Sequence, residues 1–171
     1  SDVHEPQIAG GRVELIAEVG TALKAFAQAG LIGIALDAEL GGMQLPLALA
    51  TAAYAWFHAA NTATTAYAML TSAAANMLAV NGSDEQARRW VPPMAEGRFF
   101  GTMCLSEPQA GSSLADITTR AEPQPDGSYR LFGTKMWISA GEHELAENIV
   151  HMVLAKLPGA APGVRAGWGL S

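Results

Sequence analysis

Residues 103–112, Met-Cys-Leu-Ser-Glu-Pro-Gln-Ala-Gly-Ser, change from an apolar, strand-like run to a turn of small residues. Small residues let the backbone approach a ligand closely, and successive N–H groups in such a turn attract anions. A second segment, Lys135–Ser139, carries Trp137 and, two residues later, a hydroxyl. If this segment is a strand, Trp137 and Ser139 point to one face, which suits a planar heterocycle.

The pattern before these segments is helical. Apolar residues recur at helical spacing from Gly20 to Gly30, and residues 11–19 are expected to belong to the same helix or its lead-in. Pro46 is expected to open the next long helix, which breaks at Asn61-Thr62. We therefore expect the chain up to residue 98 to be helical throughout.

A capping box predicts a further helix. Ser83 is followed three residues later by Gln86, and the glycine before Ser83 can end the preceding helix. We expect the new helix to end near Pro92-Pro93, because proline disfavours helix at the residue before it. A short helical turn at residues 94–97 is expected to complete the helical part.

Residues 40–83 contain no Asp, Glu, Lys or Arg, as membrane-spanning segments often do. Polar residues and the expected break at Asn61 interrupt this run. We therefore predict two Ala-rich helices buried in an all-helical domain, and no membrane span.

Strand patterns follow residue 98. Predicted strands cover 99–105, 127–133, 135–139 and 148–155, and 118–122 is expected to pair with 129–131 across a turn at 125–128. Residues 158–163 are expected to form a loop. The predicted fold class is α+β: an all-α N-terminal helical domain (1–97) followed by a partial antiparallel β-barrel domain (98–171).

Composition excludes several classes of function. The 171 residues are 50% hydrophobic, enough for a core, and the net charge of −6 argues against nucleic-acid binding. The single Cys104 excludes an internal disulfide, and no Cys/His spacing predicts a metal site. Residues 143–147 only partly resemble a zinc-protease helix, because Glu147 stands where the second His belongs. The polar start, residues 1–5, predicts no signal peptide, and a cytoplasmic location is expected.

Two motifs carry a family resemblance. Residues 105–112 (LSEPQAGS) and 133–139 (GTKMWIS) resemble the flavin-binding signature of the acyl-CoA dehydrogenase family. Residues 141–151 (GEHELAENIVH) are similar to the branch that acts on fatty acyl-CoA and 3-methylmercaptopropionyl-CoA thioesters. The resemblance covers residues 20–165, approximately.

The resemblance implies an FAD-dependent oxidoreductase of fatty acid metabolism. Such an enzyme oxidises an acyl-CoA thioester to the trans-2-enoyl-CoA by α-proton abstraction and β-hydride transfer to FAD. It implies acyl-CoA and an electron-transfer flavoprotein as partners, and a homodimer or homotetramer when complete. The family's catalytic glutamate lies in a C-terminal helical domain that we expect to be absent here, along with part of the β domain. No catalytic residue is therefore predicted, and the chain alone is expected to be inactive.

The resemblance also implies roles for particular residues. Ser106 would hydrogen-bond the flavin's pyrimidine edge, Ser139 would reach toward N5, and Trp137 would flank the ring. Ser112 would lie by the pyrophosphate and is also the implied substrate-binding residue. The full set of implied cofactor-binding residues is Met103, Leu105, Ser106, Gly111, Ser112, Trp137, Ile138 and Ser139. A further hypothesis is that residues 67–71, with Met69, line the acyl pocket.

The chain departs from the family pattern at three positions. The family usually has Thr where this chain has Ser106 and Ser139, so the hydroxyls remain with a looser rotamer. The usual Asp after the Gly-Ser pair is Ser113 here, which removes a charge.

Two alternative functions stay open. The chain could be a catalytically inactive flavin- or CoA-binding interaction module, or an unrelated helical interaction protein with a chance motif. Bound flavin separates the last reading from the other two, and turnover of an acyl-CoA separates an enzyme from an inactive module. Acyl-chain preference and oligomeric state do not follow from the sequence.

Overall fold

The computed structural model describes residues 3–159 and 166–170, which form a short hairpin, then helices, and then mainly strands. The chain divides into two compact units. The first comprises Ser1–Thr102 and Ala140–Val150, and the second comprises Met103–Ser139 and His151–Ser171. This α+β architecture confirms the predicted fold class, while the predicted domain boundary after residue 97 stays a prediction.

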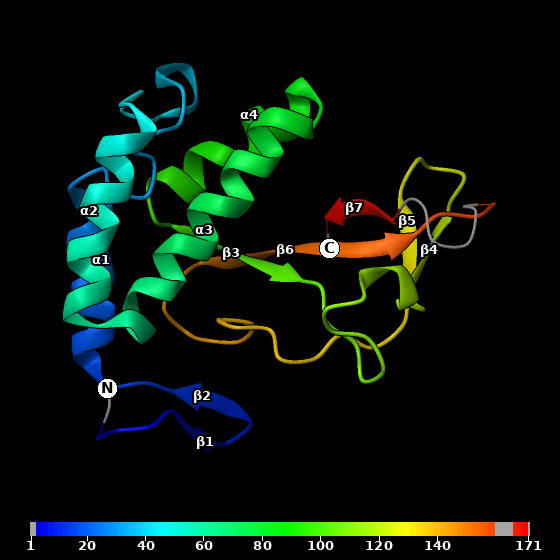
Figure 1. Cartoon of the computed structure of the whole chain (residues 1–171), viewed down its shortest axis with the longest axis horizontal. Coiled ribbons are helices and arrows are strands. Elements are labelled where there is room, and N and C mark those ends of the chain that lie inside the picture. The colour runs from blue at the N-terminus through cyan, green and yellow to red at the C-terminus, as the bar shows by residue number, and fades with distance from the viewer. Residues whose placement is uncertain (1–2, 160–165, 171) are drawn as a thin grey trace. The chain divides into compact units, whose positions relative to one another are not determined.

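Four helices make up most of the first unit: α1 (Ala17–Gln28), α2 (Leu47–Ala60), α3 (Thr62–Asn81) and α4 (Asp84–Ala95) (Figure 1). Helix α1 buries Val19, Leu23 and Phe26, which follow one another at helical spacing. These three side chains share a core cluster with Ile32, Ala68 and Phe100. A short 3-10 turn, Ala38–Leu40, lies between α1 and α2. Among the described residues, no helix is both long and apolar enough to cross a membrane.

The predicted helix boundaries at Asn61 and Ser83 are confirmed. Asn61 ends α2 and begins α3, and its Oδ1 accepts a hydrogen bond from the Thr64 amide at 2.8 Å. Ser83 and Gln86 form the complete capping box, with Ser83 Oγ 3.2 Å from the Gln86 amide and Gln86 Oε1 2.9 Å from the Ser83 amide. These caps satisfy amides that the first helical turn leaves without partners.

The predicted end of the last helix near Pro92-Pro93 is wrong. Helix α4 continues through both prolines to Ala95. Val91 and Met94 are completely buried. Their packing offsets the loss of the two backbone hydrogen bonds that the prolines cannot donate, and so stabilises the last turn. The amides of Glu96 and Arg98 then bond back to the carbonyls of the two prolines at 3.0 and 2.9 Å.

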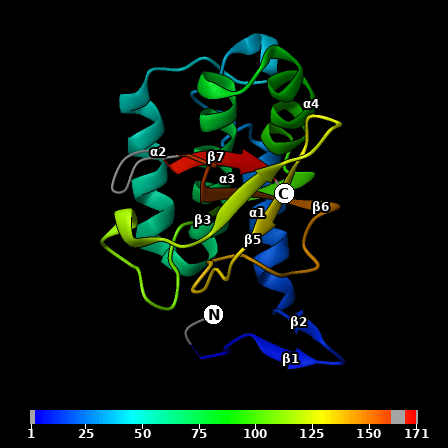
Figure 2. The ribbon, with the colours of Figure 1, turned by 90° about the vertical axis from the view of Figure 1, so that its right-hand side faces the viewer.

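Residues 11–19 were expected to belong to the first helix or its lead-in, but α1 includes only Ala17–Val19 of them, and part of the rest forms a strand. Strands β1 (Gln7–Ala9) and β2 (Arg12–Glu14) form an antiparallel hairpin that precedes α1 (Figure 2). Gly10 and Gly11 both have positive φ, +57° and +78°, as a tight two-residue hairpin turn requires. The Gly-Gly pair was the sequence signal for this turn.

The main sheet has the strand order β3-β6-β4-β5, and β7 (Ala166–Leu170) pairs with β6. Its other members are β3 (Phe99–Cys104), β4 (Arg120–Pro123), β5 (Tyr129–Phe132) and β6 (Asn148–Lys156). The predicted hairpin of β4 and β5 is confirmed, with Ala121 opposite Leu131. The sheet is not antiparallel throughout, because β4 pairs with β6 in parallel at Arg120 and Lys156. Of the predicted loop 158–163, residues 160–163 lie outside the described residues.

Candidate functional site

The two motif segments lie side by side in the second unit. The Met136 amide donates to the Ser106 carbonyl at 3.0 Å, although the two residues are far apart in the chain. One residue earlier in each segment, the Lys135 ammonium donates to the Leu105 carbonyl at 3.0 Å. The fold thus brings together the two segments that carry the family signature.

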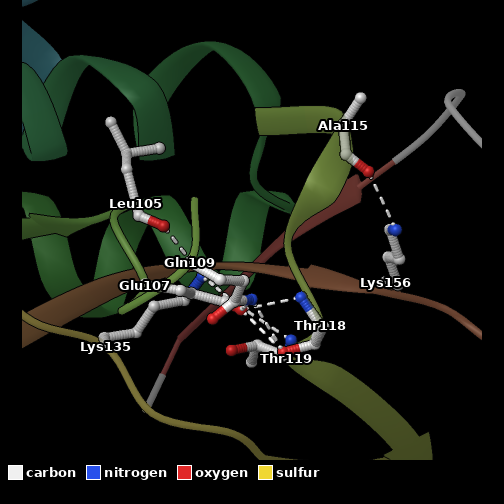
Figure 3. Close-up of polar contacts among 8 residues, drawn as sticks. All are labelled: Leu105, Glu107, Gln109, Ala115, Thr118, Thr119, Lys135 and Lys156. Carbon is white, nitrogen blue, oxygen red and sulfur yellow. Dashed lines mark hydrogen bonds and ion pairs between the residues drawn. The ribbon is translucent and has the colours of Figure 1, made fainter. Parts of the chain in front are cut away.

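A buried carboxylate, Glu107, fixes this arrangement (Figure 3). Its Oε1 accepts from Lys135 Nζ at 2.9 Å and from the Thr119 amide at 3.0 Å. Its Oε2 accepts from Gln109 Nε2 at 2.7 Å and from the amide and hydroxyl of Thr118 at 2.7 and 2.8 Å. Five donors from three separate segments therefore converge on one side chain that is 1% exposed.

These donors keep Glu107 ionised. Burial favours the neutral form and raises the pKa, but hydrogen bonds from Lys135, Thr119 and Thr118 outweigh it and hold the pKa of Glu107 far below its usual range. A carboxylate with such a low pKa and fully occupied oxygens is poorly suited to accept a proton from a substrate. Its chemistry is that of a positioning group.

The Glu107 backbone shapes the loop as well. Glu107 and Ala110 exchange both of their backbone hydrogen bonds, at 2.8 and 3.1 Å, which closes a tight turn. Ala110 is buried, whereas Gly111 and Ser112 directly after it are exposed. A Cβ added at Gly111 would meet no atom within 4 Å, so the loop faces open space there.

The predicted strand at Lys135–Ser139 is wrong. The segment is irregular: Trp137 has φ +59° and Ala140 has φ +56°. The left-handed region is costly for a bulky residue, so strand alternation no longer places Trp137 and Ser139 on one face. The indole of Trp137 is 83% exposed. An exposed aromatic on a strained backbone is typical of ligand-binding segments.

The remaining predicted site residues are at or near the surface of the same unit. Met103, Leu105, Ser106 and Ile138 are half-buried, and Ser139 is exposed. Leu105 packs against a small core of Ala110, Ile117 and Leu154. In the part of the chain that the structure describes, the hydroxyls of Ser106, Ser112 and Ser139 hydrogen-bond to no protein group, and no hydrogen bond ties Ser112 to residues 135–139.

The sequence did not predict the roles of Glu107, Lys135, Thr118 and Thr119. The first two stand inside the quoted motifs, but no spacing rule pairs two charges so far apart in the chain. A carboxylate followed by proline within an otherwise small and apolar motif was the available signal. The two threonines lie outside both motifs.

A separate cavity of about 780 Å³ lies in the helical unit, between α2, α3 and the link at residues 32–36. Met69 and Ala73 of α3 line it, opposite Ala50 and Tyr54 of α2. Its lining includes the Tyr54 and Ser72 hydroxyls, which are hydrogen-bonded to each other at 2.6 Å. No group of three or more potential metal ligands occurs within residues 3–159 and 166–170.

Sequence comparison places this chain among known proteins. The family profile described as acyl-CoA dehydrogenase, N-terminal domain, matches residues 9–98. A 3-methylmercaptopropionyl-CoA dehydrogenase of Ruegeria pomeroyi is 41% identical over 164 residues, which cover 96% of this chain and 28% of the relative. The chain thus spans less than a third of that relative's length.

Solved structures share the fold. Glutaryl-CoA dehydrogenase from Mycobacterium smegmatis has a TM-score of 0.74 at 29% identity, over 92% of this chain and 38% of the other. A structure of a glutaryl-CoA dehydrogenase from the same organism in complex with FADH2 has a TM-score of 0.72 at 27% identity, over 82% of this chain and 35% of the other.

Proposed function

The chain belongs to the acyl-CoA dehydrogenase family, and from that premise we propose that it supplies flavin-binding residues of an FAD-dependent acyl-CoA dehydrogenase. The observation that carries the proposal is the Glu107–Lys135 pair, because it joins the two signature segments within one compact unit. The resulting surface offers free hydroxyls, an open glycine and an exposed indole. These are the chemical groups that a planar, polar-edged ligand with a diphosphate tail requires.

The residues present fit FAD. Ser106 and Ser139 would donate or accept hydrogen bonds at the polar edges of the flavin ring, and Trp137 would pack against its face. Gly111 and Ser112 would approach the diphosphate, since nothing in the structure fills the space in front of Gly111. Met103, Leu105 and Ile138 would supply the apolar edge of the same site.

When bound, FAD supplies the hydride acceptor for oxidation of an acyl-CoA to the 2-enoyl-CoA. The residues of this chain would orient and bind the cofactor: Glu107 and Lys135 hold the two segments together, and the serine hydroxyls would contact the edges of the ring. No described residue is proposed as the base that removes the α-proton. The complete protein is proposed to carry that base in a C-terminal helical domain, to pass electrons to an electron-transfer flavoprotein, and to assemble as a homodimer or homotetramer.

Removing Trp137 tests the flavin assignment directly. We expect Trp137→Ala to weaken FAD binding about tenfold, the upper end for loss of one aromatic stacking contact. Quenching of flavin fluorescence during titration of the chain with FAD measures the dissociation constant. Trp56→Ala is the matched control, because Trp56 is 80% exposed but lies on α2 of the helical unit. Equal losses in the two variants, or no FAD binding by the parent chain, would refute the assignment.

We further propose that the cavity beside Met69 receives the acyl chain. Its wall is largely apolar and its volume suits an alkyl chain. Met69→Trp should narrow the cavity and weaken binding of long-chain acyl-CoA several-fold more than that of butyryl-CoA, measured by calorimetric titration. Val80→Trp is the control, because the Val80 side chain is exposed and lies outside the cavity. An unchanged chain-length preference would count against the assignment.

A catalytically inactive flavin- or CoA-binding module remains the second candidate. It shares every binding prediction above and differs only in turnover. Reduction of an artificial electron acceptor by the complete protein in the presence of an acyl-CoA separates the two. Turnover by the complete protein would establish the enzyme, and FAD binding by the complete protein without turnover would establish the binding module.

A further inference from the structure

His143 is a buried histidine with an incomplete set of hydrogen bonds. The side chain is 5% exposed and belongs to the segment 140–150, which is part of the helical unit. Its Nδ1 accepts a hydrogen bond from the Leu145 amide at 3.2 Å, so the proton of the neutral ring must reside on Nε2. Nε2 is buried and has no hydrogen-bond partner among the described residues.

Aromatic rings hold the imidazole. Tyr67 of α3 and Phe100 of β3 each meet it edge to face, with ring centroids 5.4 Å away. Two and three residues after His143, Leu145 and Ala146 pack on the core cluster that contains Val19 and Leu23. The imidazole therefore lies where segment 140–150 meets the helices.

Protonation would break this arrangement. A proton on Nδ1 turns the acceptor into a donor facing the Leu145 amide, so one hydrogen bond is lost and two donors oppose each other. The positive charge of the imidazolium would lie between two aromatic rings in a site without water, which is unfavourable unless an anion pairs with it. Burial accordingly lowers the pKa of His143, against a weaker raising effect of Glu142 and Glu144.

The surrounding charges do not offset this cost. Glu142 and Glu144 are both exposed, and Glu144 is paired with Arg12 of the β2 strand at 3.6 Å. From α3 the facing titratable group is Tyr67, whose pKa is raised by burial, so its phenol stays neutral in acid. From β3 the facing side chain is Phe100, which carries no charge.

We propose that His143 is an acid-sensitive latch that holds segment 140–150 on the helical unit in its neutral form and releases it when protonated. The segment has other attachments: the Glu147 amide donates to the Arg98 carbonyl at 3.0 Å, and Arg98 pairs with Glu147 at 3.3 Å. Neither contact involves the His143 ring. Release on mild acidification therefore isolates the contribution of the imidazole.

Hydrogen exchange measured on the chain by NMR tests the latch. A released histidine has its ordinary pKa near 6.5, so the opening equilibrium should rise about tenfold from pH 7.5 to pH 5.5. Protection factors of the hydrogen-bonded Leu145 and Glu147 amides, corrected for intrinsic exchange, should fall by that factor relative to amides in α4. His143→Gln keeps an acceptor for the Leu145 amide but does not titrate, so its protection should not change with pH.

His4→Gln, which replaces an exposed histidine, is the control and should behave like the parent chain. Nitrogen chemical shifts of the imidazole provide an independent measurement that needs no variant. They should show the Nε2–H tautomer at pH 7.5. The proposal would be overturned by protection in the parent chain that does not change with pH, or by the same pH response in His143→Gln. An Nδ1–H tautomer at pH 7.5 would overturn it as well.

Discussion

Replacing Glu107 with alanine is expected to destabilise the second unit by about 3–5 kcal/mol, the cost of breaking a buried ion pair from one side. The change leaves Lys135, whose side chain is 11% exposed, without its anion. It also leaves the buried Thr119 amide without an acceptor. Denaturant unfolding followed by circular dichroism, with exchange of the β4 and β5 amides as a local probe, measures the loss.

Glu122→Ala is the matched control. Glu122 is also a glutamate in an ion pair of this unit, with Arg120 at 2.8 Å, but both side chains are about half exposed. Exposed pairs contribute about 0–1 kcal/mol, so this variant should differ little from the parent. A loss in Glu107→Ala no larger than that in Glu122→Ala would show that the buried pair does not hold the two segments together.

The same residue predicts a pH dependence. Because the pKa of Glu107 is lower in the folded chain than its ordinary value of 4.5, its contribution to stability is complete above that value. The contribution is lost as the pH falls below it, because the unfolded chain then binds the proton more readily. Glu107→Gln removes this titration, so its unfolding free energy should decline less than the parent's between pH 6 and pH 3.5. Parallel pH profiles would contradict the low pKa.

The sequence predicted those parts of the fold that rest on local chemistry. The caps at Asn61 and Ser83 and the hairpin of β4 and β5 depend on residues that are close in the chain, and all three are confirmed. The continuation of α4 through Pro92 and Pro93 depends instead on the burial of Met94 in the folded helical unit. No local propensity contains that information.

In the candidate site, too, the sequence predicted some features, and others depend on contacts that form only in the folded chain. The motifs identified which segments belong together, and the hydrogen bond between Met136 and Ser106 is consistent with that pairing. The left-handed conformation of Trp137 could not be predicted, because its apolar neighbours suggest a strand. Lys135 and Met136, just before it, bond to residues 105–107, which are distant in the chain. Likewise, the ionisation of Glu107 depends on Thr118 and Thr119, which come together with it only in the folded chain.

Gly133→Ala is expected to destabilise the second unit by about 3–5 kcal/mol, through overpacking and a left-handed backbone together. Gly133 has φ +154°, and a Cβ there would lie 2.3 Å from Thr119 Oγ1 and 2.8 Å from Thr119 Cα. Thr119 cannot easily move away. Its amide is bonded to Glu107 at 3.0 Å, and its carbonyl accepts from the Lys156 amide at 2.8 Å.

Gly127→Ala separates the two causes. Gly127 also has a positive φ, +83°, and lies in the same unit, but a Cβ there would meet nothing within 4 Å. That variant should lose only the backbone term, about 1–2 kcal/mol. Since any shift of Thr119 also moves a donor to Glu107, Gly133→Ala should lower FAD affinity as well, whereas Gly127→Ala should not. Equal unfolding free energies and equal FAD affinities in the two variants would mean that Thr119 yields without cost, and that the Glu107 contacts are not what positions the flavin-binding segments.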